Sequence, residues 1–314
     1  MKRKMLNVPK GGYDGMKGFT IVEFLVAGLL SVIVLIAVVS SYFTSRKLND
    51  AANERLAIQQ DLRNAATLIV RDARMAGSFG CFNMSEHIEQ DVVSDVTQKN
   101  SPFSLKRNST RNSANKLIPI AESSNIVYQG FAQVRPALIF QYGIDDVNAS
   151  AETTVVSSCG VISKPGKQIP TLEDAKKELK IQNSGKEQNG NIARQRHVVN
   201  AYAVGRIAGE EGLFRFQLDD KGKWGNPQLL AKKIKRMKVL YIYVSGCPED
   251  EDAGKEEQFK YTDKFDSSVT PAGVEVLLDS GLNAKIAASS DNSIYAYRIN
   301  ATIRGGNVCA NRTL

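Results

Sequence analysis

The clearest feature of the hydrophobic pattern is a long apolar run near the N-terminus. No charged residue occurs in the twenty positions from Phe24 to Phe43. At about 1.5 Å per residue, such a helix spans about 30 Å, the thickness of a hydrocarbon core. Secretory signal peptides have a shorter apolar region, roughly 7–15 residues, and end at a small-residue cleavage site. The pattern therefore predicts a transmembrane helix. More basic residues precede the run than follow it, which favours a cytoplasmic N-terminus and export of the rest.

The helix is predicted to continue beyond the membrane as an amphipathic segment. A narrow apolar stripe recurs at helical spacing up to Gly77, a natural C-terminal stop, and no proline interrupts it. We expect this half to pack on a globular head. The stripe consists of Ala51, Ile58, Leu62, Ala65, Ile69, Ala73 and Ala76.

Downstream of the helix, the pattern changes to alternating and short apolar runs, which are typical of β-strands. We expect loops or short elements in residues 82–125 and a polar linker in residues 181–193. Residues 171–180 predict a short helix capped by Thr171 and Asp174, and residues 219–223 predict a hairpin turn. A helix followed by antiparallel strands gives the class α+β. The predicted strands lie in residues 125–131, 137–144, 153–162, 197–207, 212–220, 237–244 and 293–305.

One carboxylate, Glu23, stands at the start of the apolar helix. A charge at bilayer depth costs roughly 2.5–3.5 kcal/mol even on lenient insertion scales, and an ordinary membrane anchor leaves this residue unexplained. Cleavage between Gly18 and Phe19 would explain it. The new α-ammonium of Phe19 would lie four residues before Glu23, and the two groups would pair within one chain or between neighbouring chains.

This arrangement closely resembles the class III signal of type IV prepilins: a basic leader, Gly before the cut, an aromatic first residue and Glu fifth. The stretch "KGFTIVE" supplies Gly18, Phe19 and Glu23 in that register. Downstream, "RDARMAGSFGC", "EGLFRF", "LLAKKIKRMKVLYIYV" and "IYAYRINATIR" resemble, in order, the blocks of PilW-type minor pilins. The resemblance extends to the J-type minor pseudopilins of type II secretion.

The resemblance implies a pilin-like fold, with a long N-terminal helix packed on an antiparallel β-sheet head. It divides the chain into a cleaved leader (1–18), a transmembrane and filament-core helix (19–45), an amphipathic continuation (46–77) and a periplasmic β-rich head (78–314). Prepilin peptidase would cut after Gly18, and Phe19 would be N-methylated. The protein would stay in the bacterial inner membrane, with its head in the periplasm, until it enters a pilus.

The implied function is that of a minor pilin that helps to prime pilus assembly at or near the tip, with Glu23 pairing to an α-ammonium. Its implied partners are other minor pilins, the major pilin, prepilin peptidase and the inner-membrane assembly platform. Two alternatives stay open: a J-type pseudopilin of a secretion system, and a membrane-anchored periplasmic protein that binds a ligand.

The cysteines indicate disulfides rather than a metal site. Four widely spaced cysteines occur, without a C-x-x-C pair and without a nearby histidine. An even number in an exported domain favours two disulfides. Three pairings are open, and we favour Cys81–Cys159 with Cys247–Cys309 because each pair is local to one half of the chain.

The formal net charge of +8 invites a nucleic-acid interpretation. The densest basic cluster extends from Lys232 to Lys238, but no aromatic residue interleaves with it, and Ile234 and Met237 suggest a packed helical turn. We therefore expect these lysines to face water rather than bind DNA directly.

No catalytic motif stands out, and we expect neither enzymatic activity nor a cofactor. His87 and His197 are interpreted as structural or surface histidines. An acidic run offers hard oxygen ligands for calcium without the spacing of an EF-hand, and we interpret it as a solvated loop. It contains Glu249, Asp250, Glu251 and Asp252.

Overall fold

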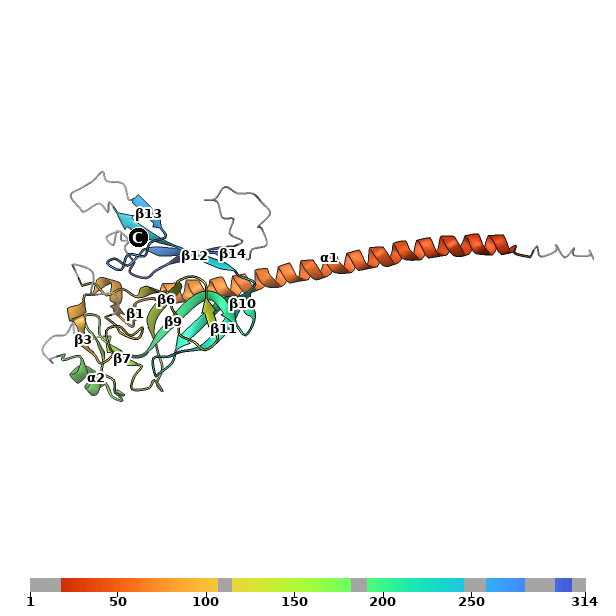
Figure 1. Cartoon of the computed structure of the whole chain (residues 1–314). Coiled ribbons are helices and arrows are strands. Elements are labelled where there is room, and N and C mark those ends of the chain that lie inside the picture. The colour runs from red at the N-terminus through yellow and green to blue at the C-terminus, as the bar shows by residue number, and fades with distance from the viewer. Residues whose placement is uncertain (1–17, 107–114, 182–190, 246–257, 280–296, 307–314) are drawn as a thin grey trace, which may run out of the picture. The chain divides into compact units, whose positions relative to one another are not determined.

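The computed structural model, shown in Figure 1, describes residues 18–106, 115–181, 191–245, 258–279 and 297–306. The predicted N-terminal helix is present as α1 (Ile21–Met75), which carries no proline and ends just before Gly77. The backbone of Gly77 has φ +78°, a conformation that favours glycine at a helix end. The chain divides into two compact units, Met1–Ala57 and Ile58–Leu314, and the division falls within α1.

In the first unit, all side chains from residue 18 to residue 57 are exposed. By length and composition, α1 is apolar enough to cross a membrane, and its start near the N-terminus agrees with the predicted anchor. One hydroxyl group within the apolar stretch is satisfied locally. The Oγ of Ser31 donates to the carbonyl oxygen of Ala27 at 2.7 Å, so this side chain presents no free donor to lipid.

In the second unit, the C-terminal part of α1 buries one face. Leu62, Ala65, Ile69 and Ala73 of the predicted stripe are buried, as the 3.6-residue periodicity indicated. Ala51, which we placed on the same stripe, is exposed. The stripe is therefore used for packing only toward the C-terminal end of the helix.

The larger sheet of this unit has nine strands among the described residues, in the path β11-β10-β9-β7-β8-β3, with β4 pairing β6 and with β5 and β6 pairing β9. Its pairs are antiparallel apart from β3 with β8, which run parallel, so the sheet is mixed rather than purely antiparallel. Its strands are β3 (Val92–Asp95), β4 (Ile120–Ser123), β5 (Phe131–Gln133), β6 (Ala137–Ile144), β7 (Thr154–Ser157), β8 (Ile162–Lys164), β9 (Ala193–Ile207), β10 (Glu210–Leu218) and β11 (Trp224–Lys232).

A second, antiparallel sheet has the order β13-β12-β14-β15 within the described ranges. Its strands are β12 (Arg236–Ser245), β13 (Gln258–Thr262), β14 (Gly273–Asp279) and β15 (Tyr297–Thr302). Smaller elements complete the unit: the hairpin of β1 (Ser78–Phe79) and β2 (Phe82–Asn83), the 3-10 turns η1 (Met84–Glu86) and η2 (Glu89–Asp91), and the helix α2 (Leu172–Glu178).

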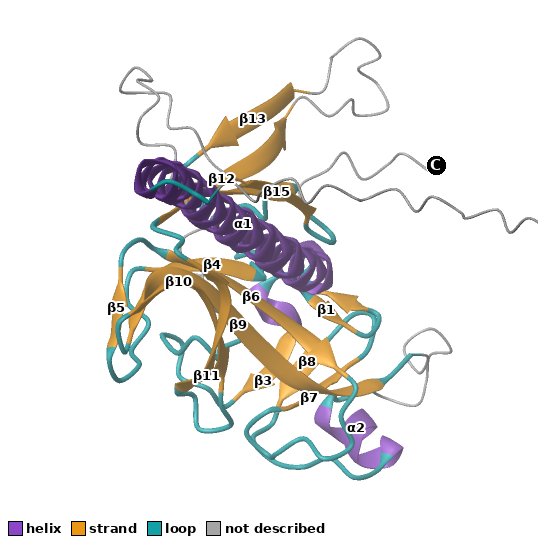
Figure 2. Ribbon diagram, turned by 90° about the vertical axis from the view of Figure 1, so that its right-hand side faces the viewer, coloured by secondary structure: helices purple, strands orange, loops and turns teal. Residues whose placement is uncertain are grey.

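The C-terminal part of α1 lies between the two sheets, as Figure 2 shows. Its apolar face and the inner faces of both sheets form one core. Ile69 of α1, Phe140 of the larger sheet and Val276 of the smaller sheet all belong to it and are fully buried. This packing of one helix by two sheets agrees with the predicted α+β class.

Several predicted elements are confirmed. Strand β6 matches the prediction for residues 137–144, and β9, β10, β12 and β15 overlap the predicted runs. The turn between β10 and β11 closes with the amide of Asp219 donating to the carbonyl of Lys223 at 2.8 Å. Helix α2 is capped as predicted, since Thr171 Oγ1 accepts from the Asp174 amide at 3.1 Å.

Two predictions of secondary structure were wrong. Residues 125–130 lie outside any strand, and only Phe131 of that stretch enters β5. The stretch around Ile234 connects β11 to β12 without a helical turn, although Ile234 and Met237 are both buried as expected. Strand β14 was not predicted because its seven-residue run, buried at every position, shows no alternation.

Candidate functional site

The segment that carries the prepilin-like pattern lies at the exposed start of α1. Gly18 has no neighbouring atom within 4 Å of an added Cβ, and the Phe19 side chain is 80% exposed. No described residue therefore blocks access to the peptide bond between Gly18 and Phe19. The leader residues 1–17, which precede the predicted cut, lie outside the described residues.

Glu23 has a local partner that sequence reasoning missed. Its Oε2 accepts hydrogen bonds from the backbone amide and the Oγ1 of Thr20, each at 3.0 Å. In return, the amide of Glu23 donates to Thr20 Oγ1 at 3.3 Å. This is a capping box, in which the residue before the helix and the third helical residue satisfy each other's backbone donors.

The capping box changes the interpretation of Glu23. The sequence "TIVE" matches the pattern of Ser or Thr followed three residues later by Glu, so the signal was present. The sequence pattern predicts an α-ammonium as the partner of this carboxylate, in the same chain or in a neighbouring one. Thr20 supplies hydrogen bonds, which lower the cost of the charge, but it carries no positive charge. Glu23 therefore remains an anion without a counter-charge in the described part of the chain.

A second carboxylate of α1, Asp72, is fully buried in the head and was not predicted. Tyr142 of β6 donates its hydroxyl to Asp72 Oδ1 at 2.9 Å. Asn200 and Tyr202 of β9 donate to Oδ2 at 2.9 Å and 2.6 Å. Arg215 of β10 forms an ion pair with Oδ2 at 3.2 Å. One helical side chain thus binds three neighbouring strands of the larger sheet.

The Asp72 carboxylate also influences the groups around it. Arg71, its neighbour in the helix, donates to Oδ1 at 3.0 Å. Burial, together with the negative charge of Asp72, raises the pKa of Tyr142 to about 12 and that of Tyr202 further. Both tyrosines therefore stay protonated and remain donors at any physiological pH. A buried carboxylate with this many donors fixes the register of the helix on the sheet, because a shift of one residue would leave the charge unpaired.

A buried lysine forms a second polar cluster in the head. Lys164 of β8 donates from Nζ to the carbonyl oxygen of Phe103 at 2.9 Å, and Nζ lies over the Phe103 ring, 3.2 Å from its centroid. His197 Nδ1 is 3.4 Å away, and His197 Nε2 lies 3.1 Å from Gln141 Oε1. Burial, partly offset by the nearby charge of Asp95, lowers the pKa of Lys164 to about 7.

Burial and the neighbouring Lys164 also lower the pKa of His197 well below its usual value, so this imidazole is neutral. A neutral ring can accept at Nδ1 and donate at Nε2, which satisfies Lys164 and Gln141 together. His87 is stacked on Phe82 at 4.1 Å between centroids and pairs with Asp91 at 3.0 Å. Both histidines therefore have partners within the head that hold their rings in place.

The remaining sequence candidates are placed as follows. Cys81 and Cys159 form a disulfide, as one of the two favoured pairings proposed. Cys247, Cys309 and the acidic run 249–252 lie outside the described residues. Across the residues that the structure describes, no three His, Cys, Asp or Glu side chains converge on a metal-sized space.

The basic cluster between β11 and β12 is largely paired with carboxylates. Lys232 lies 3.9 Å from Glu210, and Arg236 pairs with Asp279. Lys235 is exposed and forms no ion pair with a side chain in the described segments.

Comparison with known proteins gives no family for the chain: no protein-family model matches it, and no curated protein matches it either. The arrangement of side chains must therefore carry any functional conclusion.

Proposed function

We propose that this protein is a minor pilin that helps to prime type IV pilus assembly and enters the pilus at or near its tip. The observation that carries the proposal is the single helix α1, which combines three features in 55 residues. It starts beside the Gly18–Phe19 pair, exposes a charge-free apolar surface, and ends in a face buried in the head. Each feature fits one stage: processing, membrane storage and presentation of the head.

Assembly would proceed through close packing of the apolar surface of α1 against neighbouring helices. The exposed apolar side chains between Phe24 and Phe43 need lipid or another apolar surface to cover them. Exchange of lipid for neighbouring helices costs little, because both environments are apolar. Specificity then has to come from a polar pair. Glu23, an anion with hydrogen bonds from Thr20 but without a counter-charge, would pair with the α-ammonium of a processed Phe19.

The Asp72 cluster supports the same proposal from the other end of the helix. Filament assembly applies force through the helix, and the head must follow it. A buried carboxylate held by Tyr142, Tyr202 and Arg215 resists slipping between helix and sheet, because the ion pair would have to break in a low-dielectric interior.

One observation favours a second candidate, a membrane-anchored protein whose head binds a ligand. The capping box between Thr20 and Glu23 explains the carboxylate as part of a helix start, without a neighbouring chain. A J-type pseudopilin would use the same processing and helix packing as the minor pilin, and the filament with which the protein co-purifies separates those two.

The test begins with processing in cells that make type IV pili and express the full chain. We expect the intact mass of the membrane form to correspond to a chain that starts at N-methylated Phe19. Gly18→Arg should retain the leader, because a bulky cation does not fit a cleavage pocket that selects glycine. Gly28→Ala, in the middle of the apolar run where no atom lies within 4 Å of an added Cβ, is the matched control and should mature normally.

The second step asks where the mature protein is found. A minor pilin should appear in sheared pili at a small fraction of the major subunit, and its deletion should reduce the number of pili. Normal maturation of Gly18→Arg, or a mature protein that stays entirely in the membrane fraction with pilus number unchanged, would contradict the proposal and favour the anchored binding protein.

A further inference from the structure

Strand β12 has an open edge along its first half. Residues 236–242 pair with β14 on one side, but β13 pairs only with residues 241–245 on the other. Of the strands that the structure describes, none pairs with residues 236–240 on the β13 side. An unpaired strand edge presents backbone donors and acceptors that readily accept another strand.

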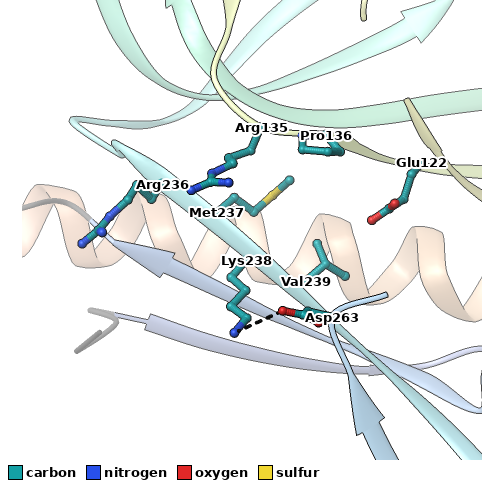
Figure 3. Close-up of a pocket in the computed structure, with 8 residues that line it drawn as sticks. All are labelled: Glu122, Arg135, Pro136, Arg236, Met237, Lys238, Val239 and Asp263. Atoms are coloured by element: carbon teal, nitrogen blue, oxygen red, sulfur yellow. Dashed lines mark ion pairs between the residues drawn. The ribbon is translucent and has the colours of Figure 1, made fainter. Parts of the chain in front are cut away.

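This open edge lines a cleft of about 430 Å³. Met237 and Val239 of β12 and Pro136 before β6 give it apolar walls, as Figure 3 shows. Met237 is buried and Val239 is half-buried, so a segment that enters the cleft meets dry surface next to the open edge. The cleft lies between the two sheets and within one compact unit.

The charges of the cleft are unevenly balanced. Arg236 and Lys238 have carboxylate partners, Asp279 and Asp263, the latter at 3.7 Å. Arg135 is exposed, and it forms no ion pair with any side chain in the described ranges. Its guanidinium extends toward the Arg236 end of the cleft, as Figure 3 shows.

At the other end lies Glu122, whose Oε1 accepts the hydroxyl of Tyr241 at 2.8 Å. Asp263 is the other acidic residue of the lining, and it is paired with Lys238. Lys235, just before β12, adds a further exposed cation next to the open edge. The exposed cations that have no ion pair in the described segments therefore lie near the open strand edge, where they favour a negatively charged ligand.

We propose that this cleft binds an extended, acidic segment of a partner protein by strand addition to residues 236–240. The partner's backbone would pair with the open edge and continue the line of β13, and one alternate set of its side chains would face Arg135. Main-chain hydrogen bonds supply affinity in this mode, and the side-chain contacts supply specificity. The proposal goes beyond a role in pili and stands or falls separately from it.

Two rival ligands fit less well. A nucleic acid offers phosphates to Arg135 but cannot pair with backbone N–H and C=O groups in alternation, and no aromatic side chain lines the cleft for base stacking. A small anion would use Arg135 alone and would leave the strand edge open. Either alternative predicts that affinity depends on the charge of the ligand but not on its backbone N–H groups. The experiment changes the charge and the backbone separately.

The experiment uses the full chain in detergent micelles and a fluorescent peptide of about eight alternating Glu and Thr residues, long enough to cover the open edge. Three related peptides serve as probes: one with Lys in place of Glu, and two in which one or the other alternate set of backbone nitrogens is methylated. Binding is measured by fluorescence anisotropy. Because strand side chains and N–H groups alternate with a period of two, only one methylated set should point at β12.

We expect saturable binding of the Glu peptide, and a loss of about tenfold or more for the Lys peptide and for one of the two methylated peptides. Arg135→Glu should weaken binding by a similar factor. Arg206→Glu is the matched control, since Arg206 is an exposed arginine of β9 that does not line the cleft. It should bind the peptide as the wild type does.

Three results would overturn the proposal. The first is the absence of saturable binding of the Glu peptide at about millimolar concentration, the weakest affinity of biological use. The second is equal binding of both methylated peptides and the parent, which would assign the cleft to a free anion. The third is unchanged binding by Arg135→Glu.

Discussion

The two carboxylates of α1, Glu23 and Asp72, are satisfied in opposite ways. Glu23 is exposed and takes its hydrogen bonds from Thr20, three residues away. Asp72 is fully buried, and its partners on the larger sheet lie 70 to 143 residues away in sequence. The first arrangement needs only a helix start. The second needs the whole head to be folded. Substitution of Asp72 should therefore lower the stability of the head, whereas substitution of Glu23 should not.

The comparison also distinguishes function from stability. Local partners leave Glu23 able to change its environment without unfolding anything, which suits a group that acts during assembly. Distant partners make Asp72 part of the fold, and it cannot exchange partners without breaking the register of α1 on the larger sheet. The following predictions test this contrast, in order of decreasing effect.

The largest effect is expected for Asp72→Ala. Removal of the carboxylate leaves the Arg215 guanidinium without its counter-charge and the hydroxyls of Tyr142 and Tyr202 without an acceptor. Breaking a buried pair in this way costs about 3–5 kcal/mol, and we expect that loss in the free energy of unfolding. Urea unfolding of the full chain in detergent, followed by tyrosine fluorescence and circular dichroism, measures it.

The matched control is Asp61→Ala, a partly exposed aspartate of the same helix. It should change the free energy of unfolding by less than about 0.5 kcal/mol, as surface changes usually do. If Asp72→Ala were as mild as Asp61→Ala, the cluster would not hold the helix on the sheet, and the contrast between the two carboxylates would disappear.

Lys164→Met should stabilise the head, and the gain should depend on pH. The pKa of Lys164 is lowered from 10.5 to about 7. Between these values the unfolded chain holds the proton and the folded chain does not, so the stability of the wild type rises with pH through this window. Below about pH 7 the lysine is charged in both states, and the full penalty of burying it is present.

The expected gain in unfolding free energy is about 1–3 kcal/mol near pH 6, because the removed penalty exceeds the lost hydrogen bond to Phe103. It should shrink toward zero as the pH approaches the ordinary lysine pKa. Urea unfolding of both proteins at several pH values measures it, and Lys167→Met, at an exposed lysine near the same strand, is the control. A gain that does not vary with pH would show that Lys164 is not buried as a titrating group.

A smaller loss is expected for Tyr202→Phe. The ring fills the same space, but Asp72 Oδ2 loses its shortest hydrogen bond, of 2.6 Å. Loss of one donor to a charged acceptor costs about 1.5–3 kcal/mol. Combined with Asp72→Ala, the second change should add almost nothing, because its partner is already gone. A double-mutant cycle in the same unfolding assay checks this, and full additivity would contradict a shared cluster.

The same contrast explains what could be predicted from the sequence. Features with local causes were found: the apolar run, the stripe of α1, the cap at Thr171 and the turn after Asp219. Asp72 escaped because its burial depends on Arg215 and Tyr202, which no local pattern connects to it. The only signal was an aspartate between the stripe positions Ile69 and Ala73, where a charge conflicts with packing.

The candidate functional residues also differ in whether their pattern is local in sequence. Gly18, Phe19 and Glu23 could be named because their pattern is contiguous, whereas the cleft beside β12 depends on where β13 ends. The sequence "TIVE" contains the capping-box pattern, but the hypothesis of an unpaired charge at Glu23 did not include a hydrogen bond from Thr20.

The smallest effect on stability, and the most informative for function, is expected at Thr20 and Glu23. Two substitutions separate the two roles of Glu23. Glu23→Gln keeps an oxygen that can accept from the Thr20 amide, so the capping box survives, but the charge is lost. Thr20→Val removes the hydroxyl from the box and leaves the charge. Loss of a cap costs about 1 kcal/mol in helix stability, too little to affect membrane insertion of so apolar a helix.

If Glu23 acts by pairing with an α-ammonium, Glu23→Gln should reduce the amount of the protein in sheared pili, at matched membrane levels, and Thr20→Val should not. If Glu23 only caps the helix, the order reverses: Thr20→Val frays the first turn and Glu23→Gln is silent. Quantitative immunoblots of membranes and sheared pili distinguish these outcomes, with N-terminal mass confirming that both variants are processed. Because a tip subunit has few neighbours, the number of pili per cell should fall more clearly than the share of the variant within each pilus. Equal pilus numbers for Glu23→Gln and wild type would leave the carboxylate as a cap and remove the physical basis for the proposed role in assembly.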